Sequence, residues 1–320
     1  MQFQFLGTSS GVPTRQRNVS GFAIRHAHQK SWVLVDCGEG TQHQLQQTEF
    51  TLRKLKAICI THVHGDHTFG LPGLISSCGM SGRKEPLTII APKDVEHYVR
   101  SALQLTDCFI PFDLNFVDVE LFNEPREIAG FILDRFPLSH RVPSFAFRFS
   151  CTITKLRLNT EKLTQDNVPK GPLWGELRAG KVVKLDDGRV LDGAKYVETT
   201  CEQQRVVVGG DNDTPELLAE ACQERDVLVH EATFTKAISD KVGPGPQHTD
   251  AAQIGAFAQI VNLPHLVLTH FSARFQSSNM HEIQDETASF YQGQLFLEND
   301  FDKFQLQLGK LICVKDDSCD

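Results

Sequence analysis

The chain has 320 residues, of which 40% are hydrophobic, and its formal net charge at pH 7 is -8. This length and composition predict a globular protein with a substantial buried core. The acidic average argues against general binding to polyanions, although a local basic surface can coexist with it, and net charge alone excludes no partner. No DNA partner is expected.

Nine cysteines are present, and none of them forms a Cys-x-x-Cys pair. An odd number without such pairs fits neither a disulfide framework nor a thiolate zinc knuckle, and predicts a reducing, cytoplasmic location. The first residues carry no basic region ahead of an apolar core, and no stretch approaches 18 uncharged apolar residues. Neither secretion nor contact with a membrane is therefore expected.

Five short segments rich in Val, Ile and Leu have the length of a strand, and each ends on a residue that can bind a metal or carry a proton. They are AICITH (57–62), ILDRFPLSH (132–140), RVVVGGD (205–211), DVLVHE (226–231) and HLVLTH (265–270). Buried strands with polar residues at their carboxyl ends build the sites of layered α/β folds, because neighbouring strand ends open onto one edge. The sequence therefore predicts an α/β protein with its site at a shared sheet edge.

Helical patterns lie between these strands. The segment TPELLAEACQE predicts a helix with Thr214 as N-cap and Pro215 in the first turn. A second helix is expected after Thr249 as N-cap, with an apolar stripe at Ile254, Phe257, Ala258 and Val261.

One region departs from this pattern. Between about Cys151 and Thr200 the strand signals thin out, while turn residues and charges increase. From Lys155 to Lys184 seven basic residues stand against three acidic ones. We expect a single domain over residues 1–320 with an inserted arm at 152–200.

The segment ITHVHGDH contains the pattern His62-x-His64-x-Asp66-His67. Imidazoles with a hard carboxylate suit Zn²⁺ and also tolerate Mn²⁺ or Fe²⁺. His62 and His64 can face one ion, and Asp66 and His67 a second. The remaining ligands are expected from the strand-end residues His140, Asp211 and His270, with Asp211 able to bridge.

A lone histidine at a strand end is more often a hydrogen-bonded core residue than a ligand, but the clustered motif favours metal binding. Two metals about 3.5 to 4 Å apart suit in-line displacement at phosphorus or hydrolysis at a carbonyl, with hydroxide as the nucleophile. The expected reaction class is hydrolysis.

The order His-x-His-x-Asp-His with later His, Asp and His resembles the signature of the metallo-β-lactamase superfamily, and Asp36 in LVDCGEG matches its first motif. That resemblance implies a four-layer αβ/βα sandwich. Five further segments resemble the ribonuclease Z family, in order from the first strand to about Phe275: FLGTSSGVPTRQRN, LVDCGEGTQHQ, GPLWGELRAG, VHEATF and LTHFSARF. This second resemblance implies a zinc-dependent homodimeric endoribonuclease that cleaves the 3′ trailer from precursor tRNA and leaves a 3′-hydroxyl.

The resemblance also implies residue roles. One Zn²⁺ would be held by His62, His64 and His140, the other by Asp66, His67 and His270, with Asp211 between them. Asp66 would in addition orient or deprotonate the attacking water. Glu231 and His248 would form the pair that protonates the leaving 3′ oxygen. The alternative interpretation is a capping or salt-bridge carboxylate for Glu231 and a surface histidine in a flexible loop for His248.

For RNA contacts, the resemblance implies that an arm carrying Gly171 and Pro172 grips the tRNA elbow, on the partner subunit of the dimer. A solvated hairpin is the alternative interpretation of this segment. In the loop PTRQRN, Arg15, Arg17 and Asn18 are expected to contact the RNA backbone. The alternative is that the loop carries ordinary surface charge. Ser272 and Arg274 are expected at the scissile phosphate, and their alternative role is to cap the next helix.

Some residues differ from the family pattern. Asn212 stands where threonine is usual, Thr249 and Asp250 follow His248 in place of Ser-Thr, and Arg15 replaces a common lysine. Asp250 is expected to add negative charge near the proton donor.

Two other functions remain open at this stage. A small-molecule phosphodiesterase or arylsulfatase-like hydrolase would share the fold and the zinc site but lack the arm. A non-catalytic RNA-binding scaffold would have a degenerate site, whereas all seven ligand candidates are present here.

Overall fold

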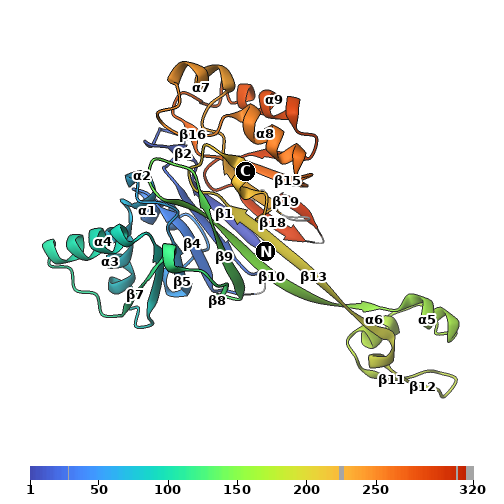
Figure 1. The fold of residues 1–320 in the computed structure, drawn as a ribbon. Helices are drawn as coiled ribbons and strands as arrows, with labels where there is room; N and C mark the ends of the chain where they lie inside the picture. Colours follow the sequence, from blue (N-terminus) through green and yellow to red (C-terminus); the bar gives the residue numbers. More distant parts are fainter. Residues whose placement is uncertain (28, 223–226, 308, 315–320) are drawn as a thin grey trace. The chain divides into compact units, whose positions relative to one another are not determined.

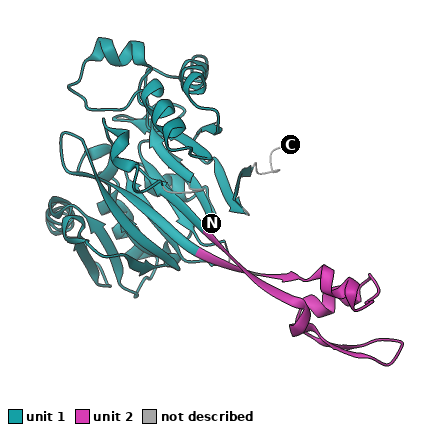
Figure 2. Ribbon diagram, turned by 45° about the vertical axis from the view of Figure 1, so that its right-hand side comes forward, with its two compact units in different colours: residues 1–151, 204–320 teal, residues 152–203 magenta. Residues whose placement is uncertain are grey.

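A computed structural model of the chain describes residues 1–27, 29–222, 227–307 and 309–314 (Figure 1). The chain divides into two compact units (Figure 2). The first combines Met1–Cys151 with Gln204–Asp320, and the second is Thr152–Gln203. The second unit contains the segment that the sequence marks as an insertion.

The first unit holds two large mixed sheets. The eight-stranded sheet has the order β19-β18-β1-β3-β4-β5-β6-β7. The four strands from β4 to β7 run parallel, and β4 is buried at every position because a parallel sheet in this class is covered on both faces. The bounds are β19 Lys310–Val314, β18 Lys303–Gln307, β1 Gln2–Gly7, β3 Gly21–Arg25, β4 Trp32–Cys37, β5 Leu55–Cys59, β6 Leu87–Ala91 and β7 Leu114–Asp118.

The seven-stranded sheet has the order β17-β15-β14-β13-β10-β9-β8. Its strands β13, β14, β15 and β17 are parallel and in matched register, so their carboxyl ends lie at one edge. The bounds are β17 Gln294–Leu297, β15 His265–Thr269, β14 Val227–Glu231, β13 Val197–Val208, β10 Ser144–Leu158, β9 Phe131–Leu138 and β8 Arg126–Ile128.

Helices cover the outer face of each sheet. Side chains of α3 (Leu71–Met80) and α4 (Lys93–Leu105) share one core with Leu34 and Ile58 of the first sheet. Those of α8 (Ala251–Ile260) and α9 (His281–Phe290) share another with the second sheet. Between the sheets, Phe296 of β17 meets Phe304 of β18, with ring centroids 5.1 Å apart. The expected four-layer αβ/βα sandwich is confirmed.

The short elements of this unit sit largely in its loops. They are β2 (Ser9–Ser10), β16 (Phe271–Ser272), α1 (Thr41–Leu45), α2 (Gly65–Thr68), α7 (Lys236–Val242) and the 3-10 turns η1 (Leu52–Lys54), η2 (Val119–Leu121) and η4 (Pro215–Leu218). The described part of the chain contains no helix with the length and apolar character needed to cross a bilayer.

Two helix predictions need correction. The helix expected from Thr214 is only the 3-10 turn η4, and the Thr214 hydroxyl bonds Asp213 instead of capping it; residues 223 and 224 of this segment lie outside the described residues. At α8 the N-cap is Asp250, whose carboxylate accepts the backbone N–H of Gln253 at 2.9 Å. Thr249 donates its hydroxyl to the backbone oxygen of Asn212, so it is not available as the cap.

The second unit has a small core of its own. It contains α5 (Thr160–Gln165), α6 (Leu173–Arg178), η3 (Gly193–Tyr196) and the two-stranded sheet of β11 (Val182–Lys184) and β12 (Val190–Asp192). Seven buried apolar residues form the core, against which Leu173 and Trp174 pack. The arm is therefore a folded element with its own packing.

Candidate metal centre and active site

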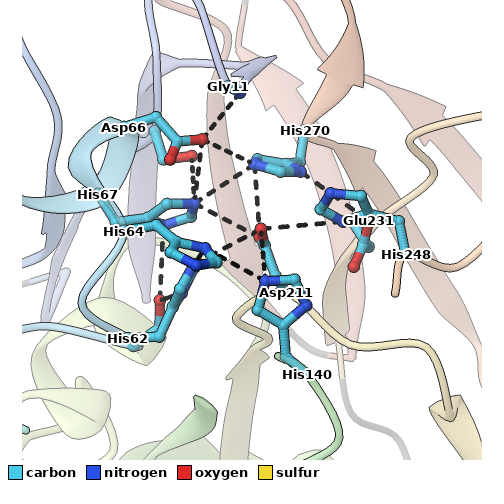
Figure 3. A network of polar contacts seen from close by, with 12 residues as sticks. Gly11, His62, His64, Asp66, His67, His140, Asp211, Glu231, His248 and His270 are labelled. Atoms are coloured by element: carbon cyan, nitrogen blue, oxygen red, sulfur yellow. Dashed lines mark hydrogen bonds and ion pairs between the residues drawn. The ribbon is translucent and has the colours of Figure 1, made fainter. Parts of the chain in front are cut away.

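The loops that follow β5, β9, β13 and β15 converge on one place in the first unit (Figure 3). The loop after β5 brings His62, His64, Asp66 and His67, because α2 starts there and turns the last two side chains inward. The other three strand ends bring His140, Asp211 and His270. All seven candidate ligands therefore gather at one place, but they come from two sheets: β5 belongs to the eight-stranded sheet, and β9, β13 and β15 belong to the seven-stranded one. The expectation of a single shared sheet edge is corrected in this respect.

Four donor atoms form a first group. His62 Nε2 lies 3.0 Å from His64 Nδ1, and His140 Nε2 lies 3.2 Å from the same nitrogen. Oδ2 of Asp211 completes the group, at 3.6 Å from His62 Nε2 and 3.8 Å from His140 Nε2.

A second group of four shares Asp211 through its other oxygen. Oδ1 of Asp211 lies 3.4 Å from His67 Nε2 and 3.4 Å from His270 Nε2. These two nitrogens are 3.3 Å apart. Asp66 Oδ2 lies 3.5 Å from His67 Nε2 and 3.4 Å from His270 Nε2. Asp211 thus stands between the two groups with one oxygen in each (Figure 3).

Both groups fit a divalent cation. Ligands about 2.0 to 2.2 Å from a tetrahedral ion are separated from one another by roughly 3.3 Å, and the distances above scatter around that value. The chemistry of the donors agrees, since Asp211 is 3% exposed and a buried carboxylate needs a compensating positive charge. The arrangement is that of a divalent metal site built from imidazole and carboxylate donors.

The two groups differ in their electrostatics. Burial lowers the pKa of His62, His64 and His140, which favours the neutral imidazole that a metal requires. Burial also opposes the charged forms of His67 and His270, but the surrounding carboxylates raise the pKa of both, that of His270 to about 10. The second group therefore carries an excess of negative charge that a cation would balance.

Asp36 supports the ligand loop. Its Oδ2 lies 2.7 Å from His67 Nδ1, and its Oδ1 accepts the backbone N–H of Thr61 at 2.8 Å. A carboxylate on the far nitrogen of a ligating histidine fixes the tautomer and orientation of the ring. Asp36 and His270 both adopt a left-handed backbone conformation, with φ of 58° and 56°, which places strain at the site itself.

Glu231 and His248 form a pair next to Asp211. His248 Nδ1 lies 2.9 Å from Glu231 Oε2 and 3.8 Å from Asp211 Oδ2. Burial disfavours both charged forms, but their mutual attraction lowers the pKa of Glu231 to about 2 and raises the pKa of His248. Asp250 caps α8, and the groups that raise the pKa of His248 are Glu231 and Asp211.

A cleft of about 730 Å³ borders His248. Its wall also includes Phe234, Lys236 and Gln247. The cleft is open, and it gives the imidazole access to a bound molecule.

The predicted RNA-contacting loop divides into an outer and an inner part. Arg15 is exposed, whereas Arg17 is 6% exposed and donates to Thr8 Oγ1 at 2.7 Å and Asn299 Oδ1 at 3.0 Å. The Asn18 side-chain amide donates to the backbone oxygen of Glu39 at 2.9 Å. The RNA contact predicted for Arg17 is therefore wrong, because its buried guanidinium donates its hydrogen bonds to acceptors inside the protein.

Ser272 and Arg274 follow the ligand His270. Ser272 is buried in β16, and its Oγ accepts from Arg274 Nη1 at 3.3 Å. Arg274 is exposed and stacks over the Phe234 ring, with its guanidinium carbon 5.8 Å from the centroid. Gly171 and Pro172 lie in the second unit, where both are exposed and Pro172 precedes α6.

Three polar residues of the site have no role assigned to them from the sequence. Thr61 Oγ1 lies 3.0 Å from His62 Nδ1 and donates to Asp36. Thr233 Oγ1 lies 2.5 Å from Glu231 Oε2 and 2.9 Å from the backbone oxygen of His270, either of which can accept its one proton. The backbone N–H of Asn212 donates to Glu231 Oε1 at 2.6 Å. Each lies within two residues of a predicted ligand or proton carrier, and that adjacency was the available signal.

The comparisons with known proteins agree with this geometry. The profile of the Metallo-beta-lactamase superfamily matches residues 14–145. The chain is 47% identical to Ribonuclease Z of Marinobacter nauticus over 312 residues, which covers 96% of this chain and 97% of that protein. The chain belongs to the ribonuclease Z family.

Other members of the ribonuclease Z family extend the likeness. Ribonuclease Z of Pseudomonas putida is 48% identical over 311 residues, covering 96% of this chain and 97% of that protein. The crystal structure of human tRNase Z, short form, superposes with a TM-score of 0.63 at 23% identity, covering 96% of this chain and 100% of that one, and so shares the fold. The chain is thus a metal-binding hydrolase of this family.

Proposed function

We propose that the chain is an endoribonuclease that removes the 3′ trailer from precursor tRNA and leaves a 3′-hydroxyl on the tRNA. The relatives that it matches along nearly their whole length carry the name Ribonuclease Z. The observation that carries the proposal is the pair of four-donor groups sharing Asp211, with the Glu231–His248 pair beside them.

Two Zn²⁺ ions per chain are the cofactor in this proposal, with Mn²⁺ or Fe²⁺ as substitutes. His62, His64 and His140 would hold one, Asp66, His67 and His270 the other, with one oxygen of Asp211 toward each. When bound, such a pair polarises a phosphodiester and supplies hydroxide at neutral pH. The free oxygen of Asp66 is suited to orient the attacking water.

His248 is the proposed proton donor to the leaving 3′ oxygen of the tRNA. Glu231 Oε2 lies 2.9 Å from Nδ1 of the imidazole, which leaves Nε2 for the substrate, and the cleft beside His248 provides the room. A donor placed this way contributes about 10²- to 10⁴-fold to the rate of cleavage of a poor leaving group. Thr233 and Asn212 fix Glu231 in turn.

The RNA contacts in the proposal are electrostatic and follow shape more than sequence. Arg15, Asn18, Ser272 and Arg274 are candidates near the scissile phosphate, and Arg17 serves the loop from inside. The arm with Gly171 and Pro172 is the proposed grip on the tRNA elbow, acting from the partner subunit of a homodimer. A cytoplasmic location is supported by the buried free thiols Cys37, Cys59 and Cys78.

The test compares two substrates of the metal-loaded protein: a precursor tRNA with mapped cleavage sites, and bis(p-nitrophenyl) phosphate. The proposal expects one cut at the start of the trailer and a 3′-hydroxyl on the tRNA. Efficient turnover of the small diester with no cleavage of the precursor would favour the alternative, a small-molecule phosphodiesterase. Binding of tRNA with cleavage of neither substrate would favour the scaffold.

A further inference from the structure

The loop Thr8–Asn18, close to the N-terminus of the chain, reaches the metal centre. At its tip, the backbone N–H of Gly11 donates to Asp66 Oδ2 at 2.8 Å (Figure 3). That oxygen is the one that faces His67 and His270 in the second donor group. Among the described residues, no hydrogen bond engages the other oxygen of Asp66.

The geometry points to a positioning role for this loop: Gly11 N–H and the buried Arg17 fix the carboxylate of Asp66, so that one oxygen faces the second metal and the other faces the water. This inference rests on the proposed function, in which Asp66 has both tasks. A hydrogen bond to a carboxylate is directional, so it selects one of the rotamers that an unheld aspartate would sample.

The tip conformation depends on glycine. Gly11 has φ of 71°, in the left-handed region, and a Cβ built there would meet nothing within 4 Å. A larger residue is therefore opposed by backbone strain and not by lack of space. Relief of that strain would turn the N–H away from Asp66.

The base of the loop is closed by its own backbone and by the end of β17. The backbone N–H groups of Thr8 and Ser9 both donate to the oxygen of Asn18, at 2.9 and 2.8 Å. Asp300 accepts from the Asn18 N–H at 2.6 Å and from the Thr8 hydroxyl at 2.8 Å. A segment some 280 residues away in the chain thus holds the start and the end of the loop together.

Arg17 stabilises the closed end of the loop. Its guanidinium donates to Thr8, to the backbone oxygen of Glu298 and to Asn299, and lies 5.0 Å from the ring centroid of Phe271. Phe271 follows the ligand His270 and pairs with Ser9 in the β2–β16 ladder. One buried side chain therefore ties the loop to the strand end that carries a ligand of the same metal.

Two variants test the inference, each with a matched control. Gly11→Ala introduces strain at the tip, and Gly82→Ala introduces the same strain in the turn after α3, where φ is 78° and the space is equally open. Arg17→Met removes the buried guanidinium. Arg83→Met removes another buried guanidinium, which donates to the backbone oxygens of residues 52, 55, 85 and 86, and lies 5.4 Å from the ring centroid of Phe112.

Two measurements separate positioning from folding: the rate of zinc release to a chromogenic chelator, and kcat and KM for bis(p-nitrophenyl) phosphate. For Gly11→Ala and Arg17→Met we expect zinc release about tenfold faster and kcat lower by about ten- to a hundredfold with KM unchanged, the factor for losing a hydrogen bond to a charged group. Both controls should stay within about twofold of the native chain in each measurement.

The inference fails if the loop variants match their controls in zinc release and in kcat, whatever the loss in thermal stability. Should Gly11→Ala not fold, Arg17→Met decides alone, with Arg17→Lys expected to recover part of the loss. No step of this test involves RNA. Absence of precursor cleavage with normal diester turnover would therefore overturn the proposed function and leave this inference standing.

Discussion

Replacing Glu231 with glutamine removes one charge from the site with little change in shape. The carboxylate is 2% exposed and lies 2.9 Å from His248 Nδ1. At an effective dielectric constant near 20, two unit charges at that distance attract by about 6 kcal/mol, part of which offsets the cost of burying them. An amide can still accept the Asn212 N–H, so we expect a folded protein whose His248 is a poorer proton donor.

The expected loss is about 10²- to 10⁴-fold in the single-turnover rate on precursor tRNA, equivalent to about 3 to 5 kcal/mol of transition-state stabilisation. Hydrolysis of bis(p-nitrophenyl) phosphate should fall less than tenfold, because p-nitrophenolate leaves without a proton. Glu85→Gln, which removes an exposed ion pair to Lys56, is the matched control and should leave both rates unchanged. Equal losses of Glu231→Gln on both substrates would refute the proton-donor role and make the pair a structural support.

Three further predictions concern other parts of the chain. Asp36→Asn weakens the hold on His67, so zinc affinity should fall about 10- to 100-fold in a chelator competition, and an unchanged affinity would contradict the supporting role. Replacing Thr152–Gln203 by a short turn between the neighbouring strands β10 and β13 should abolish precursor cleavage and spare the small diester, whereas equal losses on both would argue against an RNA-binding arm. Glu298 is a buried carboxyl that no hydrogen-bond partner reaches within the described part of the chain, and burial, followed by repulsion from Asp302, raises its pKa from 4.5 to about 9. The folded state then holds a proton that the unfolded state loses, so stability falls by up to about 1.4 kcal/mol per pH unit as pH rises from about 4.5 to 9. Glu298→Gln should flatten this slope in urea titrations, and an unchanged slope would show that another group causes it.

Much of the centre could be predicted because its determinants are local in sequence. The motif from His62 to His67 specifies four donors within one loop, and an apolar strand before Asp211 or His270 marks a sheet edge. Parallel register then brings these ends together without further information. The fold and the gathering of the ligands follow from patterns that a few residues carry.

The remaining features of the site depend on tertiary hydrogen-bond partners, which a local sequence pattern does not identify. Nothing in PTRQRN distinguishes the exposed Arg15 from the buried Arg17, because the acceptors of Arg17 lie about 280 residues further along. The hydrogen bond from Gly11 to Asp66 is donated by a backbone N–H, which every residue except proline has, so the residue type gives no signal for it. At α8, Thr249 and Asp250 are both good caps, and a tertiary bond to Asn212 decided between them.

One signal was present in the sequence and was not used. Glu298, Asn299 and Asp300 follow the apolar strand β17 just as the metal ligands follow theirs. They reach the same edge of the second sheet, where they hold the loop and not a metal. Polar residues after an apolar strand thus mark the edge, but the donor type does not separate ligands from supports, because Asp211 and Asp300 are both carboxylates.

The central claim is a pair of cations that share Asp211. The most direct measurement is an anomalous difference map from crystals of the metal-loaded protein, recorded at the absorption edge of the bound metal. We predict two peaks, one in each four-donor group, each about 2 Å from its ligand atoms and with one Asp211 oxygen toward each. A single peak, or peaks away from these residues, would contradict the account.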